Sequence, residues 1–223
     1  MTAALIRQKG YGRFMPHPNR LQPDGTFLAT PARGGFMGNR GRLHDATGTI
    51  GPRLWQTKLW ITCTLHPKPG RAPQGITPPN GYTRLFFHDE AVACAAGHRP
   101  CAECRRAAYN DFRAAWSRAF GTTPRATEID TILHAARIDP ATRRPRRHEA
   151  DLAHLPDGAF LLWNDQPHRV TGDSLHPFRP DGYAKPIPRP TGRVVVLTPE
   201  PLIRVMQNGW QPLLDPALDR PNW

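Results

Sequence analysis

The chain has 223 residues, enough to bury a hydrophobic core as one domain or as two small domains packed together. No stretch approaches the roughly 20 apolar residues of a membrane-spanning helix, and the first residues lack the apolar run of a signal peptide. We therefore expect a cytoplasmic protein without a membrane partner. The net charge of +12, carried almost entirely by arginine, favours an anionic partner, because guanidinium groups bind phosphate well.

Residues 1–50 are rich in Gly, Pro and Arg and show little periodicity, which predicts an extended arm, either wrapped around the body or partly disordered. Residues 53–65 alternate at period two and predict a strand. A second strand is expected over residues 82–87. A short helix is expected over residues 89–96, with Asp89 as its N-cap.

Residues 102–120 predict an amphipathic helix, because aromatic side chains recur along one face. Arg106 and Arg113 lie beside that face, one heptad apart. The next predicted helix covers about residues 123–138 and has a proline in its first turn. The arginine-rich run at residues 143–148 predicts an exposed basic loop.

Beyond Leu155 the pattern changes, because turn signals recur about every eight to twelve residues between short apolar runs. This spacing is typical of a small antiparallel sheet or barrel. A last helix is expected to end near Gln207.

Two of the four cysteines form a metal-binding pattern. Cys101 and Cys104 make a C-x-x-C that follows a glycine-containing turn and leads into a helix, as in zinc knuckles. In a reducing compartment such a pair indicates metal ligands rather than a disulfide. Cys63 and His66, at the end of the first predicted strand, would complete a Cys3His site for Zn2+.

Other assignments remain open for this site. His44, His88 and His98 compete for one ligand position, and Cys63 also fits a buried position on an apolar strand face. Cys94 lies among alanines in the short helix and is predicted to be a core residue.

Residues 82–87 and 95–105, with their Phe-Phe strand, alanine-rich helix and G-H-R-P-C-x-x-C-R knuckle, resemble the second half of the N-terminal zinc domain of Ada-type DNA repair proteins. The resemblance implies a zinc ion, contact with the DNA backbone, and irreversible transfer of a methyl group from a phosphotriester to the first cysteine. Cys101 and Cys104 match the second ligand pair, and Cys63 matches the methyl acceptor. His66 stands one residue closer than the family's second cysteine.

The whole chain also resembles a family of small bacterial proteins that share residues 38–41, the Leu43-His44-Asp45 step and the knuckle. That second resemblance implies no activity.

These observations predict an α+β fold in which an Ada-like zinc module packs with a small antiparallel β unit. The expected organisation is an arm over residues 1–50, a zinc-binding α+β module over 51–140, a basic linker over 141–154, and the β unit with a C-terminal helix over 155–223.

The favoured function is a zinc-stabilised protein that binds the phosphate backbone of nucleic acid, DNA in preference to RNA. Expected contacts are Arg99, Arg105, Arg106, Arg113 and, as a stacking platform, Trp60. One alternative is methyl transfer onto zinc-bound Cys63. A weaker one is a metal-dependent nuclease that uses His44. No protein partner is indicated.

Overall fold

The computed structural model describes residues 16–66 and 75–214. These residues form two β-sheets and four α-helices, so the predicted α+β class is confirmed. None of the helices in the described ranges is long and apolar enough to span a membrane.

The N-terminal sheet has the strand order β2-β1-β5-β3-β4-β6. Its strands are β1 (Pro18–Leu21), β2 (Phe27–Ala29), β3 (Phe36–Asn39), β4 (Ile61–Cys63), β5 (Leu85–Phe87) and β6 (Arg99–Pro100). The pairs β1–β5 and β4–β6 are parallel, and the other neighbours are antiparallel.

This sheet corrects the expectation of an extended N-terminal arm. Residues 16–50 supply three of its strands, and β3 lies between β4 and β5, which come later in the chain. Of the strand predicted over residues 53–65, only Ile61–Cys63 near its end forms a strand, β4. The segment before β4 turns instead, because the amides of Gln56 and Thr57 donate to the carbonyl of Arg40 at 2.8 and 3.1 Å.

The C-terminal sheet is antiparallel, in the order β11-β10-β9-β8-β13-β7, with β12 paired to β10. Its strands are β7 (His148–Asp151), β8 (Phe160–Trp163), β9 (Gln166–Thr171), β10 (Ser174–Arg179), β11 (Gly182–Tyr183), β12 (Ile187–Pro188) and β13 (Arg193–Val196). The part of the expected linker that forms β7 belongs to this sheet, because residues 148–151 pair with β13.

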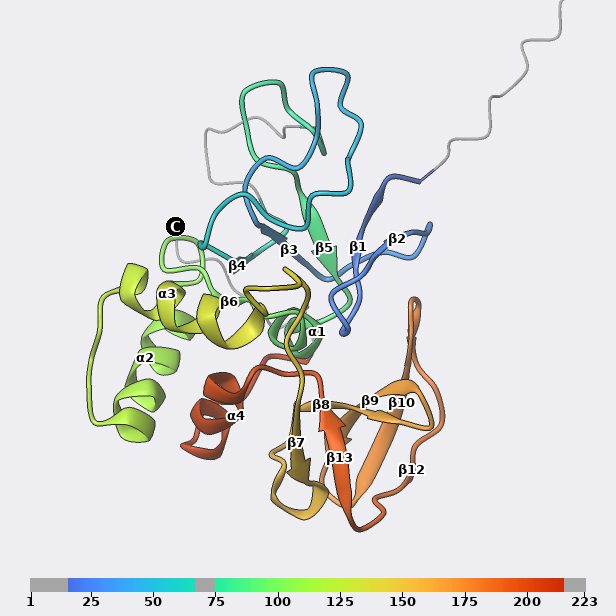
Figure 1. The fold of residues 1–223 in the computed structure, drawn as a ribbon, viewed down its shortest axis with the longest axis vertical. Helices are drawn as coiled ribbons and strands as arrows, with labels where there is room; N and C mark the ends of the chain where they lie inside the picture. The colour runs from blue at the N-terminus through green and yellow to red at the C-terminus, as the bar shows by residue number, and fades with distance from the viewer. Residues whose placement is uncertain (1–15, 67–74, 215–223) are drawn as a thin grey trace, which may run out of the picture.

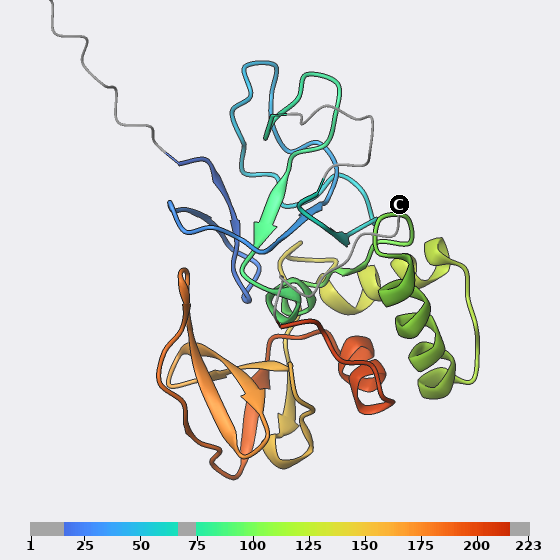
Figure 2. The ribbon, with the colours of Figure 1, turned by 180° about the vertical axis from the view of Figure 1, so that it is seen from behind.

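A short helix, α1 (Glu90–Ala95), lies between the two sheets in both views (Figures 1 and 2). Asp89 caps it as predicted, accepting the amide of Val92 at 2.8 Å. All six residues of α1 are buried. One core cluster joins α1 to Phe87 of the first sheet and Phe160 of the second, so the two sheets share a hydrophobic core.

The remaining helices are α2 (Arg106–Phe120), α3 (Ala126–Arg137) and α4 (Glu200–Gln207), which lie together on one side of the molecule (Figures 1 and 2). The predicted apolar face of α2 is confirmed, since Tyr109, Phe112 and Trp116 are buried against α3 and α4. The helix ends at Gly121, whose φ of 68° gives the left-handed cap that favours glycine.

Candidate metal centre

Three cysteine side chains converge where β4, β6 and α2 meet. Cys63 ends β4, Cys101 follows β6, and Cys104 lies in the turn before α2. Because β4 and β6 are parallel with Thr62 opposite Pro100, the residues that follow them emerge side by side. The amide of Cys101 donates to the carbonyl of Thr62 at 3.0 Å and fixes this arrangement.

The three sulfur atoms lie within 4.8 Å of one another, and the side chains are buried, with exposed fractions of 7%, 6% and 8%. None of the three forms a disulfide. Tetrahedral coordination with Zn–S bonds of about 2.3 Å places sulfurs about 3.8 Å apart. The three sulfurs are therefore close enough together to bind one metal ion, and an all-sulfur set favours Zn2+ over hard cations such as Mg2+.

Hydrogen bonds to Cys101 favour the thiolate form of its side chain. Donation from the thiols of Cys104 and Cys63, and from the backbone amides of Cys104 and Glu103, lowers the pKa of Cys101 to about 2. In return, the pKa of Cys104 rises to about 11, and the pKa of Cys63 rises well above its ordinary value. The amide of Glu103 donates to Cys101 Sγ at 3.4 Å. A divalent metal would replace the protons that the three sulfurs share.

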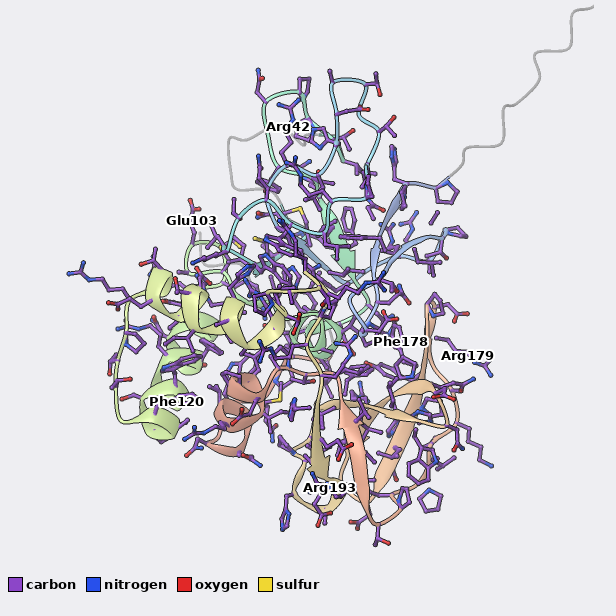
Figure 3. The ribbon with its side chains drawn as sticks, in the orientation of Figure 1. Arg42, Glu103, Phe120, Phe178, Arg179 and Arg193 are labelled. Atoms are coloured by element: carbon purple, nitrogen blue, oxygen red, sulfur yellow. The ribbon has the colours of Figure 1, made fainter. Side chains whose placement is uncertain are left out.

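The structure does not bring His66 to this cluster. Its side chain is exposed, and its backbone amide donates to Thr64 Oγ1 at 3.1 Å. Within the described ranges, no histidine or carboxylate joins the three sulfurs at the same distance. Tyr82 also lies near Cys63, a neighbour that the sequence did not reveal. Burial and the nearby Cys63 raise the pKa of its phenol. Glu103 lies on the exposed loop beside the cluster (Figure 3).

Two predicted phosphate contacts are buried ion pairs instead. Arg99 is 1% exposed and makes two hydrogen bonds of 2.8 Å to the carboxylate of Asp130. Arg105 is 3% exposed and makes a two-pronged contact with Glu90. Both guanidinium groups are buried and each is compensated by a buried carboxylate, so neither offers a contact for phosphate. On α2, Arg106 is exposed and Arg113 is half-buried.

Trp60 is not a surface platform either, because it is 2% exposed. The guanidinium carbons of Arg40 and Arg137 lie 3.6 and 3.8 Å from its ring centroid. Because both guanidinium groups lie this close to the same ring, they must stack on opposite faces of the indole. The indole N–H donates to the carbonyl of Thr57 at 2.9 Å, which satisfies the polar atom of the ring.

His44 has a structural role in the loops of the first sheet. Its Nδ1 lies 2.7 Å from Thr83 Oγ1, and its Nε2 lies 3.0 Å from the carbonyl oxygen of Pro78. Both ring nitrogens are therefore occupied, which argues against a nuclease role. His88 and His98 also lie outside the cluster, packed against Tyr183 and Trp60 respectively.

Cys94 is fully buried among the residues of the helical core and is not part of the cysteine cluster. The prediction of a core position is confirmed.

An exposed arginine lies beside a different tryptophan. Trp55 is half-buried, and the guanidinium carbon of Arg143 lies 5.0 Å from its ring centroid. The backbone of the neighbouring Lys58 is tied to α3, because its carbonyl accepts Arg137 Nη2 at 2.7 Å. We define the Trp55 patch by its aromatic residue and four of the exposed basic side chains on these two loops: Trp55, Lys58, Arg143, Arg144 and Arg146.

No protein-family model, no curated protein and no solved structure matches this chain. The resemblance to the Ada-type zinc domain therefore remains an expectation that rests on the knuckle and the strand and helix before it.

Proposed function

We propose that the chain is a zinc-stabilised protein that binds the phosphate backbone of nucleic acid through the Trp55 patch. The observation that carries this proposal is the contact of exposed Arg143 with the half-buried ring of Trp55, together with the exposure of Arg144 and Arg146 on the same loop after α3. Buried and paired arginines such as Arg99 and Arg105 contribute to net charge but not to a contact surface. The patch arginines are available to phosphates.

One carboxylate lies beside the patch. Asp139 begins the same loop, accepts the amides of Ala141 and Thr142 at 3.0 and 2.7 Å, and interacts electrostatically with Arg146, so it offsets part of the positive charge of the patch. Arg144 and Arg146 are exposed beyond this turn. Each phosphate that such side chains neutralise releases counterions, so binding should weaken steeply with salt.

The aromatic ring favours single-stranded nucleic acid. Trp55 offers an exposed part of its ring beside cationic groups, and bases stack on such rings without sequence preference. Zinc, when bound by Cys63, Cys101 and Cys104, would supply a cross-link between β4, β6 and the start of α2. That cross-link would hold α2, and through the helical core α3, in place beneath the basic loop.

The proposal is tested by fluorescence anisotropy with labelled oligonucleotides of about 16 nucleotides, as single-stranded DNA, single-stranded RNA and duplex DNA. The patch variant is Arg143→Gln/Arg144→Gln. The matched control is Arg179→Gln/Arg193→Gln, two exposed arginines on the C-terminal sheet, far from α3 (Figure 3). Both variants lose two positive charges, so the comparison separates location from net charge.

We expect the patch variant to bind single-stranded DNA about tenfold more weakly, and the slope of log K against log salt to fall by about 1.4, which corresponds to two phosphate contacts. The control should change affinity by less than about threefold. Equal losses in the two variants would show that only overall charge matters and would contradict the patch.

Methyl transfer onto Cys63 is a second candidate, supported by one observation: the residue that matches the acceptor joins the two knuckle cysteines in one cluster. A metal-bound thiolate is a nucleophile that needs no separate base. In transfer, a sulfur–carbon bond would form as the carbon–oxygen bond of the phosphotriester breaks, leaving a phosphodiester. Incubation with DNA that contains methyl phosphotriesters should add the mass of one methylene unit to the protein. An unchanged mass for zinc-loaded protein excludes this candidate.

A further inference from the structure

A small cavity of about 10 Å3 lies between the turn after β1, the end of α3 and the loop before β7. It has room for one water-sized particle. Four of its lining residues are arginines and one is acidic: Arg40, Arg137, Arg146, Arg147 and Asp24. Trp60 forms another part of the wall. A cavity with this lining carries an excess of positive charge.

Among residues 16–66 and 75–214, no carboxylate forms an ion pair with the two most buried arginines of the lining. Arg40 and Arg137 are each 2% exposed and stack on Trp60. Their guanidinium groups donate to backbone carbonyls: Arg40 to Ala96 at 2.7 Å, and Arg137 to Gly97 at 2.7 Å. Carbonyl oxygens satisfy hydrogen bonds but carry only partial charge, so they compensate the two buried cations only in part.

The nearest buried carboxylate is already engaged. Asp130 makes both of its short hydrogen bonds to Arg99, so three buried guanidiniums share one carboxylate. Nε of Arg137 is buried and has no hydrogen-bond partner. Burial lowers the pKa of Arg137 to about 9, against an opposing effect of Asp130. An unpaired buried N–H donor beside an excess of positive charge is the local signature of an anion site.

The rim adds positive charge but little negative charge. Arg147 is half-buried and donates to the backbone carbonyl of Asp24. The carboxylate of Asp24 accepts the amide and the hydroxyl of Thr26 at 2.9 and 2.7 Å. Arg146 is exposed at the mouth. One carboxylate at the rim therefore faces four arginines.

We propose that this cavity binds a single monatomic anion, chloride in ordinary buffers, between Arg137 and the arginines of the rim. The cavity has room for about one water, so chloride, which is slightly larger, requires only a small outward shift of the rim side chains, whereas phosphate and sulfate require a much larger opening. A water molecule would fill the space but leave the charge of Arg40 and Arg137 only partly compensated. The bound anion would stabilise the packing of the β1–β2 turn and α3 around Trp60. Arg146 belongs both to the cavity lining and to the Trp55 patch, but anion binding in the cavity does not require nucleic acid binding.

The test is the thermal unfolding of the wild-type protein at constant ionic strength, with sodium gluconate replaced stepwise by sodium chloride or sodium bromide. A ligand that binds only the folded state raises Tm with its concentration. We expect both halides to raise Tm, by about 5–10 °C at a hundredfold excess over Kd. Sodium phosphate can also raise Tm, by binding the exposed arginines of the Trp55 patch and by its general salt effect, but that rise should not depend on Arg147.

Two variants locate the effect. Arg147→Gln removes a rim charge and should at least halve the halide-dependent shift in Tm. Arg144→Gln, an exposed arginine of the same loop that does not line the cavity, should leave the shift unchanged. A bromide-soaked crystal should show an anomalous peak within hydrogen-bond distance of Arg137 Nε.

Equal Tm values in gluconate, chloride and bromide would overturn the proposal, and so would a crystal without the bromide peak. Arg147-dependent stabilisation by phosphate but not by halides would overturn it as well, because the cavity would then have to open for a larger oxyanion.

Discussion

Two hydrogen bonds of 2.8 Å join the guanidinium of Arg99 to the carboxylate of Asp130 in the protein interior. Arg99 forms β6 immediately before the cysteine knuckle, and Asp130 lies on α3. The pair therefore links the candidate metal centre to the helix that supports the Trp55 patch. Burial raises the pKa of Asp130, and the Arg99 guanidinium opposes that rise.

Asp130→Asn should destabilise the protein by about 3–5 kcal/mol, because it leaves the buried Arg99 charge without a partner. The double variant Arg99→Met/Asp130→Leu should cost less than the single one. Urea unfolding of both measures this. The matched control is Glu149→Gln, which breaks the exposed pair with Arg193 and should cost about 1 kcal/mol or less. Equal costs for the buried and exposed pairs would contradict a structural role for Arg99.

Purified protein should contain a single zinc ion that depends on the cysteine cluster. Cys63→Ser, Cys101→Ser and Cys104→Ser should each lower zinc content, as measured by elemental analysis, because each removes one of the three converging sulfurs. Cys94→Ser should retain zinc. Removal of the ion by a chelator should lower Tm, because metal binding is coupled to folding.

The variant His66→Ala tests whether His66 is the fourth zinc ligand. Since the exposed His66 is not brought to the three sulfurs, its variant should retain the metal. Loss of zinc from His66→Ala would instead restore the Cys3His site that the sequence suggests.

The two tryptophans should respond differently to substitution. Trp60→Phe should lower stability, because it removes ring area from the stack between Arg40 and Arg137, but it should not change affinity for single-stranded DNA. Trp55→Ala should lower that affinity, with a loss of about 1–3 kcal/mol if one base stacks on the ring. Anisotropy titrations and urea unfolding of both variants separate the effects. Weaker binding by Trp60→Phe alone would place the aromatic contact elsewhere.

Acid should destabilise the region around His134. Burial, with smaller effects of Arg137, Lys58 and Arg40, lowers the pKa of this imidazole to about 4. An unfolded chain takes up the proton near pH 6.5, whereas the folded protein resists it until about pH 4. Stability is therefore lost as the pH falls through that window.

The control for this pH dependence is His134→Gln, which should lose less stability than the wild type between about pH 7 and pH 5. Denaturant midpoints at the two pH values give the comparison. Part of the effect should persist in the variant, because burial also lowers the pKa of His98 well below its ordinary value. An unchanged pH dependence in His134→Gln would contradict the assignment.

Local patterns in the sequence determined the features that depend on neighbouring residues. The spacing of Cys101 and Cys104, the apolar face of α2 and the cap of Asp89 on α1 are all set within a few residues along the chain. Frequent turns after Leu155 likewise predicted the antiparallel strands of the second sheet. Such features are visible in sequence because one or two turns of chain fix them.

Tertiary structure alone decided which charged and aromatic residues are accessible. Arg99 is compensated by a carboxylate 31 residues away, and the cationic groups around Trp60 come from Arg40 and Arg137 on distant segments. The glycine- and proline-rich N-terminal segment became strands because β1 pairs with β5, more than sixty residues later, with Arg20 opposite Phe86. A buried charge is stable only beside its partner, and strand pairing satisfies backbone groups across the sheet, so neither is encoded in local periodicity.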